Sequence, residues 1–201
     1  QQFTADVHNR EIKRLDDAEF LRRNQFREDS GPTSHPVRPE TYLEIDNFYT
    51  GFRENLTPCL NHSSFSLVEH DIRDPLTLKT DFTHVFNLAC PASPPAYQKD
   101  PIYTTKTSVL GVIHTAEFAL KCGASYIHTS TSEAYGDPKE HPQKESYWGH
   151  VNPVGIRSCY DEGKRCAESL IYDYQRLHKL DPKVIRIFNT YGPMMDPEDG
   201  R

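Results

Sequence analysis

The sequence predicts an α/β fold built on a parallel sheet with helices packed against it. Short apolar runs rich in β-branched and aromatic residues recur along the 201 residues, and each is followed by a loop or a helical pattern. Strands that alternate with helices are typical of a doubly wound parallel sheet, because parallel strands need a crossover connection. Ligands of such sheets bind beside the carboxyl ends of the strands, so we expect functional side chains there.

Helices and strands alternate from residue 42 onwards. Two segments have the length and periodicity of helices: Ile102–Lys121, which Gly123 ends, and Ser158 to about His178. Strands are expected at Tyr42–Ile45, Phe65–Val68, Val85–Leu88, Tyr126–Thr129 and Val184–Phe188. The polar and small residues that fall at strand ends are Asp46, Asp71, Ala89, Thr131 and Asn189.

The first 40 residues differ from the rest of the chain. Glu11–Arg23 could form a helix with one apolar stripe. Ser30–Pro39 contains three prolines and a glycine, which is typical of a linker. The composition favours a solvated, poorly ordered leader over residues 1–40. We therefore expect a single α/β domain over residues 41–201.

Composition and charge argue against several classes of partner. The formal net charge of −6 argues against nucleic acid. No stretch approaches the roughly 20 apolar residues of a membrane span, and no signal-peptide pattern is present. The five cysteines form no Cys-x-x-Cys pair, and the ten histidines have no metal-ligand spacing. These features favour a cytoplasmic protein with reduced thiols and no metal site.

A tyrosine and a lysine four residues apart are the main candidates for chemistry. Tyr160 and Lys164 share one face of the second predicted helix, one turn from each other. A free tyrosine has a pKa of about 10 and is a weak base at neutral pH, but a nearby ammonium favours the phenolate. The pair could therefore take a proton from a hydroxyl group. The spacing alone also occurs by chance on surface helices, so the flanking residues decide.

The flanking segments carry a more specific pattern. Its parts are Thr129–Pro138, Glu145–Gly149, Asn152–Pro153, Ser158–Arg165, Leu88–Pro94 and Arg186–Pro193. The pattern resembles UDP-glucuronate decarboxylases, which are extended short-chain dehydrogenases/reductases that act on nucleotide sugars, and it runs from about Tyr42 to Arg201. The resemblance implies a Rossmann-type fold, NAD as cofactor, UDP-glucuronate as substrate, and a homodimer packed through the two long helices. Residues 41–201 would then form a partial NAD-binding domain.

The same resemblance assigns catalytic roles. Tyr160 would be the acid/base, with Lys164 lowering its pKa and binding the cofactor ribose. Thr131 would hydrogen-bond the reacting sugar oxygen, and Glu133 would relay a proton near C5. Ser132 stands where 4,6-dehydratases carry an aspartate, and a serine suits a substrate that already has a carboxylate, because a second close negative charge would cost Coulomb energy. Thr131 could instead cap the strand end, and Glu133 could be an ordinary loop carboxylate.

Binding residues are assigned in the same way. Those that would contact NAD are Asp46, Asn47, Thr50, Gly51, Asp71, Ile72, Leu88 and Thr107, together with Tyr160 and Lys164. Lys106 and Asn189 would contact the substrate. Asp46 and Asp71 could instead be turn residues at strand ends, and Lys106 could be a solvated helix charge.

The sequence departs from the family pattern in several places. A Gly-x-x-Gly-x-x-Gly loop that holds the pyrophosphate is expected before Asp46, but the only glycine there is Gly31. Ser108 stands where the family usually has Asn, and Met194 stands where it has Arg. We therefore expect a fragment or an aberrant gene model that lacks the first strand, the glycine-rich loop and the C-terminal part of the substrate site.

Two other functions stay open at this point. One is another nucleotide-sugar epimerase or 4,6-dehydratase, which the serine at position 132 and the Tyr147–Gly149 segment disfavour. The other is an inactive partner that dimerises with a full-length homologue. A full-length eukaryotic form could lie in the Golgi.

Overall fold

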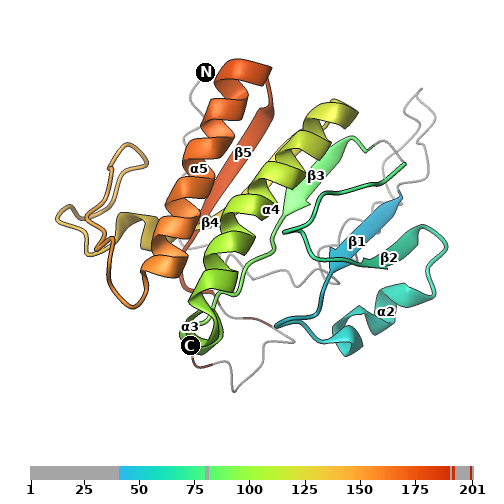
Figure 1. The fold of residues 1–201 in the computed structure, drawn as a ribbon, viewed down its shortest axis with the longest axis horizontal. Helices are drawn as coiled ribbons and strands as arrows, with labels where there is room; N and C mark the ends of the chain where they lie inside the picture. Colours follow the sequence, from blue (N-terminus) through green and yellow to red (C-terminus); the bar gives the residue numbers. More distant parts are fainter. Residues whose placement is uncertain (1–40, 80–81, 191, 193–199, 201) are drawn as a thin grey trace, which may run out of the picture.

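The computed structural model describes residues 41–79, 82–190, 192 and 200 (Figure 1). The expected leader over residues 1–40, with its helix at Glu11–Arg23, and Met194 lie outside these ranges. The described residues form five strands, which are β1 (Tyr42–Asp46), β2 (Phe65–Glu69), β3 (His84–Asn87), β4 (Ser125–Thr131) and β5 (Asp181–Ile187). The helical elements are η1 (Arg53–Leu56), α2 (Thr57–Leu60), α3 (Pro94–Lys99), α4 (Pro101–Cys122), η2 (Ser132–Tyr135) and α5 (Ser158–His178).

The strand pairings are parallel throughout, which confirms the predicted fold class. β1 pairs with β2, and a second sheet has the order β3-β4-β5. The described strands therefore form two parallel sheets, where we expected one. Within each sheet the carboxyl ends of the strands share one edge, so Asp46 and Thr131 both close a strand on the ligand-binding side that this architecture uses.

The predicted elements are confirmed, but several boundaries differ; β4, for example, ends at Thr131 and not at Thr129. β5 begins at Asp181, three residues before the predicted start, because Ser125 and Tyr126 pair with Asp181 and Pro182. Pro182 is tolerated because β5 has a neighbour on one side only within the described sheet. Helix α4 ends at Gly123 as predicted, and Gly123 takes the left-handed conformation (φ 66°) that suits glycine at a helix C-terminus.

Helices α4 and α5 run side by side across one face of the β3-β4-β5 sheet (Figure 1). Side chains alternate along a strand, so every second residue of β4 points at these helices. The resulting core joins the helices to the sheet through buried Val112, Ala116, Tyr126, Ala167 and Ile171. Phe86 and Ile185 belong to the opposite set of strand positions and are exposed.

Close contact between the helices depends on a glycine. A Cβ atom at Gly163 of α5 would lie 3.1 Å from the hydroxyl oxygen of Ser108 on α4. The glycine therefore lets α5 approach α4 at the level of Tyr160 and Lys164, which flank it in the helix. Ser108 is buried and its hydroxyl lies 3.3 Å from the Cys90 sulfur, so the residue that departs from the family pattern is part of this packing.

We predict that Ile171→Ala destabilises the fold by about 2 to 5 kcal/mol, because a fully buried side chain would leave a cavity between α5 and the sheet. Urea unfolding followed by circular dichroism measures the change. Leu177→Ala on the same helix is the matched control, since Leu177 is 74% exposed and should change the unfolding free energy by no more than about 0.5 kcal/mol. Equal losses in the two variants would contradict the packing described.

Candidate active site

The two residues singled out by their spacing lie in the first turns of α5, both buried. The Lys164 ammonium nitrogen lies 5.9 Å from the centre of the Tyr160 ring. It donates a hydrogen bond of 2.7 Å to the carbonyl oxygen of Thr129 in β4. Burial lowers the pKa of Lys164, since desolvation disfavours the charged form. The sheet therefore holds the lysine close to the tyrosine and leaves two of its three ammonium protons without a hydrogen-bond partner among the described residues.

Thr131, Ser132 and Glu133, which the sequence assigned to the same site as Tyr160, lie where strand β4 passes into the short helix η2. Thr131 is buried at the strand end, and its hydroxyl accepts a hydrogen bond of 3.2 Å from the Glu133 backbone N–H. Thr131 thus caps η2, which is the local role weighed against catalysis from the sequence. Ser132 and Glu133 line a cavity of about 180 Å³ that Phe188, after β5, also borders. The Glu133 carboxylate pairs with the Arg157 guanidinium at 2.7 Å.

A tyrosine that the sequence did not single out lies against Tyr160. The rings of Tyr97, on α3, and Tyr160 are stacked with centres 5.0 Å apart and planes 9° apart. Tyr97 is 1% exposed, and burial raises the pKa of its hydroxyl. The stack fixes the plane of the Tyr160 ring, so the proposed base has little rotational freedom.

An ion pair between partly buried Arg186 and buried Glu168 lies next to the η2 turn in the chain, because it also binds Ser130. Arg186 of β5 donates two hydrogen bonds to the Glu168 carboxylate on α5, at 2.9 and 2.7 Å, and the Ser130 hydroxyl donates a third to the same carboxylate. Arg186 also stacks over the Tyr135 ring, 4.7 Å from its centre. Burial alone would raise the pKa of Glu168, but the hydrogen bonds from Arg186 and Ser130 outweigh it and lower that pKa. The pair therefore joins α5, β4 and β5 at Ser130, the residue before Thr131.

The predicted cofactor residues at the end of β1 form a tight turn. One carboxylate oxygen of Asp46 accepts a hydrogen bond of 2.6 Å from the Phe48 backbone N–H. The other accepts no hydrogen bond from the described residues, and it would lie 3.2 Å from a Cβ at Gly51, so glycine keeps the space beside it open. Thr50 is exposed next to it. The turn thus leaves an acceptor oxygen at the strand end, where a ribose hydroxyl could donate.

Asp71, by contrast, is fully engaged by protein groups. Its two oxygens accept hydrogen bonds from the Arg73 backbone N–H, from the Arg73 guanidinium at 3.0 and 2.8 Å, and from the Asn47 side chain at 2.8 Å. A carboxylate has about four acceptor positions, so none is left for a ligand in this arrangement. Burial would raise the pKa of Asp71, but the bonds from Arg73 and Asn47 outweigh it and lower the pKa to about 2. Arg73 also lies over the Tyr103 ring, 4.0 Å from its centre.

The other predicted cofactor residues are spread along the neighbouring elements. Ile72 is buried, and its side chain occupies the space that a Cβ on Gly111 would need, at 2.3 Å. Thr107 is buried with its hydroxyl bonded to the Tyr103 carbonyl oxygen at 2.9 Å within α4. Leu88 follows β3 and is exposed.

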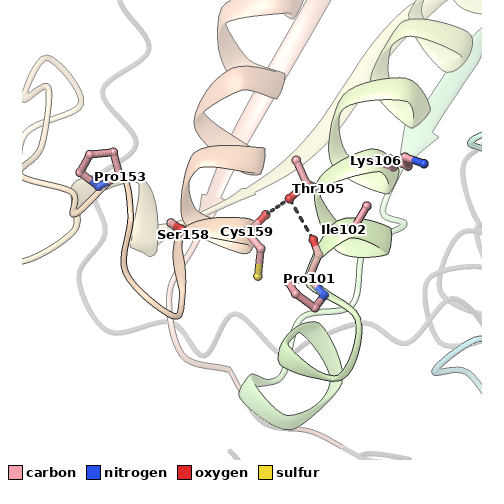
Figure 2. A pocket seen from close by; sticks show the side chains of 7 residues that line it. All are labelled: Pro101, Ile102, Thr105, Lys106, Pro153, Ser158 and Cys159. Carbon is pink, nitrogen blue, oxygen red and sulfur yellow. Dashed lines mark hydrogen bonds between the residues drawn. The ribbon is translucent and has the colours of Figure 1, made fainter.

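Of the two predicted substrate residues, Lys106 lies on a different cavity from Ser132 and Glu133, and Asn189 follows Phe188, which borders theirs. Lys106 borders a cavity of about 420 Å³ between the N-terminal ends of α4 and α5 (Figure 2). There the Thr105 hydroxyl donates to the Cys159 carbonyl oxygen at 3.3 Å. Asn189 is exposed after β5. The structure therefore brings Tyr160, Lys164, Thr131 and Glu133 into one region, and places Lys106 on a different cavity.

Several residues of the site were not identified from the sequence. They are Tyr97, Arg157, Asp161, Glu168, Arg186 and Arg73. Tyr97, Glu168 and Arg186 have partners on other elements, so no spacing pattern could identify them. Arg73 and Asp161 differ, because Arg73 bonds Asp71 two residues before it and Asp161 lies one turn after Arg157, so local spacing could have suggested them. Within the described ranges no cluster of three or more His, Cys, Asp or Glu could hold a metal ion, and no helix is long and apolar enough to cross a membrane.

Comparison with known proteins now places the chain in a family. The family model described as GDP-mannose 4,6 dehydratase matches residues 41–199. The chain belongs to this family, within the extended short-chain dehydrogenases/reductases. UDP-glucuronic acid decarboxylase 3 of Arabidopsis thaliana is 52% identical over 156 residues, and UDP-glucuronic acid decarboxylase 1 of Xenopus tropicalis is 48% identical over 157. Each match covers 78% of this chain, which spans 45% and 37% of the length of those relatives.

Solved structures of family members share the fold. A UDP-glucose 4-epimerase from Thermotoga maritima with UDP-glucose superimposes with a TM-score of 0.65 at 27% identity, covering 79% of this chain and 50% of that one. A dTDP-glucose 4,6-dehydratase from Streptomyces venezuelae with NAD and TYD bound gives a TM-score of 0.69 at 26% identity, covering 81% and 50%. These matches confirm the Rossmann-type prediction.

We predict that Arg186→Ala destabilises the fold by about 3 kcal/mol, because it leaves the Glu168 carboxylate buried without its main partner. The unfolding free energy from urea titration measures this loss. Arg176→Ala is the control, since Arg176 pairs with Asp173 on the exposed side of α5 and its removal should cost less than about 1 kcal/mol. If the two variants unfold alike, the buried pair does not hold these elements together.

The lowered pKa of Asp71 predicts an acid-dependent stability. Its folded pKa of about 2 lies below the usual value of about 3.9, so the ionised group stabilises the fold above about pH 4, and this contribution falls as the pH drops towards 2. Asp71→Asn should therefore flatten the fall in unfolding free energy between about pH 5 and pH 3. Asp74→Asn, at an exposed carboxylate nearby, should keep it. An unchanged fall in the Asp71 variant would refute the assignment.

Proposed function

We propose that this protein acts in the decarboxylation of UDP-glucuronate to UDP-xylose with NAD as a recycled cofactor. The observation that carries the proposal is the buried Tyr160–Lys164 pair beside the Thr131–Glu133 turn, in a chain about half identical to UDP-glucuronic acid decarboxylases. Ser132 supports a substrate that already carries a carboxylate, because a close aspartate there would repel it.

The residues present fit an NAD molecule in part. Asp46 keeps one acceptor oxygen for a ribose hydroxyl, and Lys164 keeps two ammonium donors for the other ribose. The Arg73 side chain would have to leave Asp71 before that carboxylate could accept a bond from the cofactor. Asn47, Thr50, Gly51, Ile72, Leu88 and Thr107 complete the proposed contacts. A bound NAD would supply the acceptor, and later the donor, of a hydride at C4 of the sugar.

The chain's own groups account for the proton movements. Tyr160 takes the proton of the C4 hydroxyl, helped by the lysine charge one turn away, and Thr131 hydrogen-bonds the same oxygen. Once C4 carries a ketone, the C6 carboxylate is β to it and can leave as carbon dioxide. Glu133 then guides a proton to C5, and Tyr160 returns its proton to the C4 oxygen. Lys106 and Asn189 are proposed to contact the nucleotide-sugar substrate.

We also propose a homodimer packed through α4 and α5. The family resemblance supports it, as does the exposed apolar side chain of Ile102 on α4. A cytoplasmic location is proposed from the five cysteines, none of which forms a disulfide with another described residue.

The decisive experiment incubates the chain with UDP-glucuronate and NAD and follows products by mass spectrometry. We expect UDP-xylose, and a loss of about 10² to 10⁴-fold in rate for Tyr160→Phe, since the acid/base is removed. Tyr172→Phe is the matched control, because Tyr172 is an exposed tyrosine on the same helix and should leave the rate unchanged.

The other products separate the alternatives. A C4 epimer or a 6-deoxy-4-keto sugar from a neutral nucleotide sugar would instead support an epimerase or a dehydratase. No turnover by the unaltered chain would refute a working decarboxylase and favour an inactive dimerisation partner.

A further inference from the structure

Two carboxylates in the candidate site, those of Glu133 and Asp161, belong to residues that bond Arg157. Arg157 precedes α5 and pairs with Glu133 on η2 at 2.7 Å. Asp161 lies one helical turn after Arg157, and its backbone N–H donates to the Arg157 carbonyl oxygen at 3.1 Å. The side chain of Asp161 is close enough to both partners for their charges to act on it. Arg157 therefore contacts the proposed proton relay through its side chain and a second acid through its backbone.

The buried side chain of Asp161 lacks a hydrogen bond. The residue is 8% exposed, and one of its carboxylate oxygens has no hydrogen-bond partner among the described residues. An unpartnered carboxylate is costly to bury in its charged form. Burial and the charge of Glu133 accordingly raise the pKa of Asp161 to about 6, and Arg157 offsets only part of this rise. Asp161 thus changes its charge close to neutral pH.

The charged and titratable groups around Asp161 come from three elements. Glu133 faces it from η2, Tyr97 from α3, and Arg157, Cys159 and Glu162 from the start of α5. Arg157 is the one cation in this described group. With Asp161 neutral, Arg157 and Glu133 form a closed pair. With Asp161 ionised, one positive charge faces two negative charges, and the two carboxylates compete for the Arg157 guanidinium.

We propose that Asp161 is a positioning residue that controls whether Arg157 holds Glu133. Neutral Asp161 leaves the guanidinium on Glu133. Ionised Asp161 draws the guanidinium towards its own unpartnered oxygen and frees the Glu133 carboxylate to face the cavity. This inference rests on the proposed role of Glu133 as a proton relay.

Tyr97 links the proposed shift of Arg157 to Tyr160, the proposed acid/base. Its ring is stacked on Tyr160, and its hydroxyl lies within the influence of the Arg157 charge. A shift of Arg157 therefore occurs beside both proposed proton carriers, Glu133 and Tyr160. Asp161 would in this way set the pH range in which the relay is available.

The test follows the Glu133 carboxyl carbon directly, by NMR of chain labelled with ¹³C at glutamate carboxyl groups, from about pH 4 to about pH 8. Glu133→Gln assigns the signal. In the unaltered chain we expect an inflection near pH 6 in the Glu133 shift, arising from Asp161. Asp161→Asn should abolish that inflection, while Asp173→Asn, at an exposed aspartate on the same helix, should keep it.

A second variant tests the proposal in case Asp161→Asn does not fold. Arg157→Gln removes the shared cation and should weaken the same inflection, because Glu133 then has no guanidinium to lose. No inflection in the unaltered chain, or one that persists in Asp161→Asn, would overturn the proposal. These measurements need no substrate, so their outcome is independent of whether the chain turns over UDP-glucuronate. Where it does, Asp161→Asn should shift the pH profile of kcat and leave KM unchanged.

Discussion

The buried pairing of Glu168 with Arg186 is the interaction on which the rest of the candidate site depends. It joins α5, β4 and β5 at one point, through Arg186 on one side and the Ser130 hydroxyl on the other. Ser130 is the residue before Thr131, so the position of the η2 turn follows from this contact. A buried ion pair gives little net stability when compared with apolar packing, but it fixes geometry because each partner is costly to leave alone.

Burial away from water also determines the properties of the residues that we propose as catalytic. Lys164 is buried and keeps a single strong hydrogen bond to β4, so its charge lies near Tyr160 in a medium that screens it poorly. Gly163 between them allows α4 to come close, and the Tyr97 ring covers the other side of Tyr160. The proposed base is thus held by packing, and the acidic groups near Arg157 are the part of the site for which we propose a change of charge.

The two ends of the predicted cofactor site differ. At β1, Asp46 keeps an acceptor oxygen beside Gly51, which suits a ribose hydroxyl. At the end of β2, Asp71 has all its acceptor positions occupied by Arg73 and Asn47. A cofactor that used both would have to replace the Arg73 contact. Family membership and the decarboxylase relatives support the proposed chemistry, and these local contacts bear on how readily this chain could bind the cofactor.

The sequence by itself determined the elements and the strand-end residues. Apolar periodicity is local, so it located β1 to β5 and both long helices to within a few residues, and the four-residue spacing placed Tyr160 and Lys164 on one helix face. Tertiary structure alone decided what these residues meet. Ser130 and Glu168 are 38 positions apart, Glu133 and Arg157 belong to different segments, and Lys106 borders a cavity away from Ser132. Such contacts, and the pKa shifts that burial produces, depend on the order of strands and the approach of helices, which no local pattern encodes.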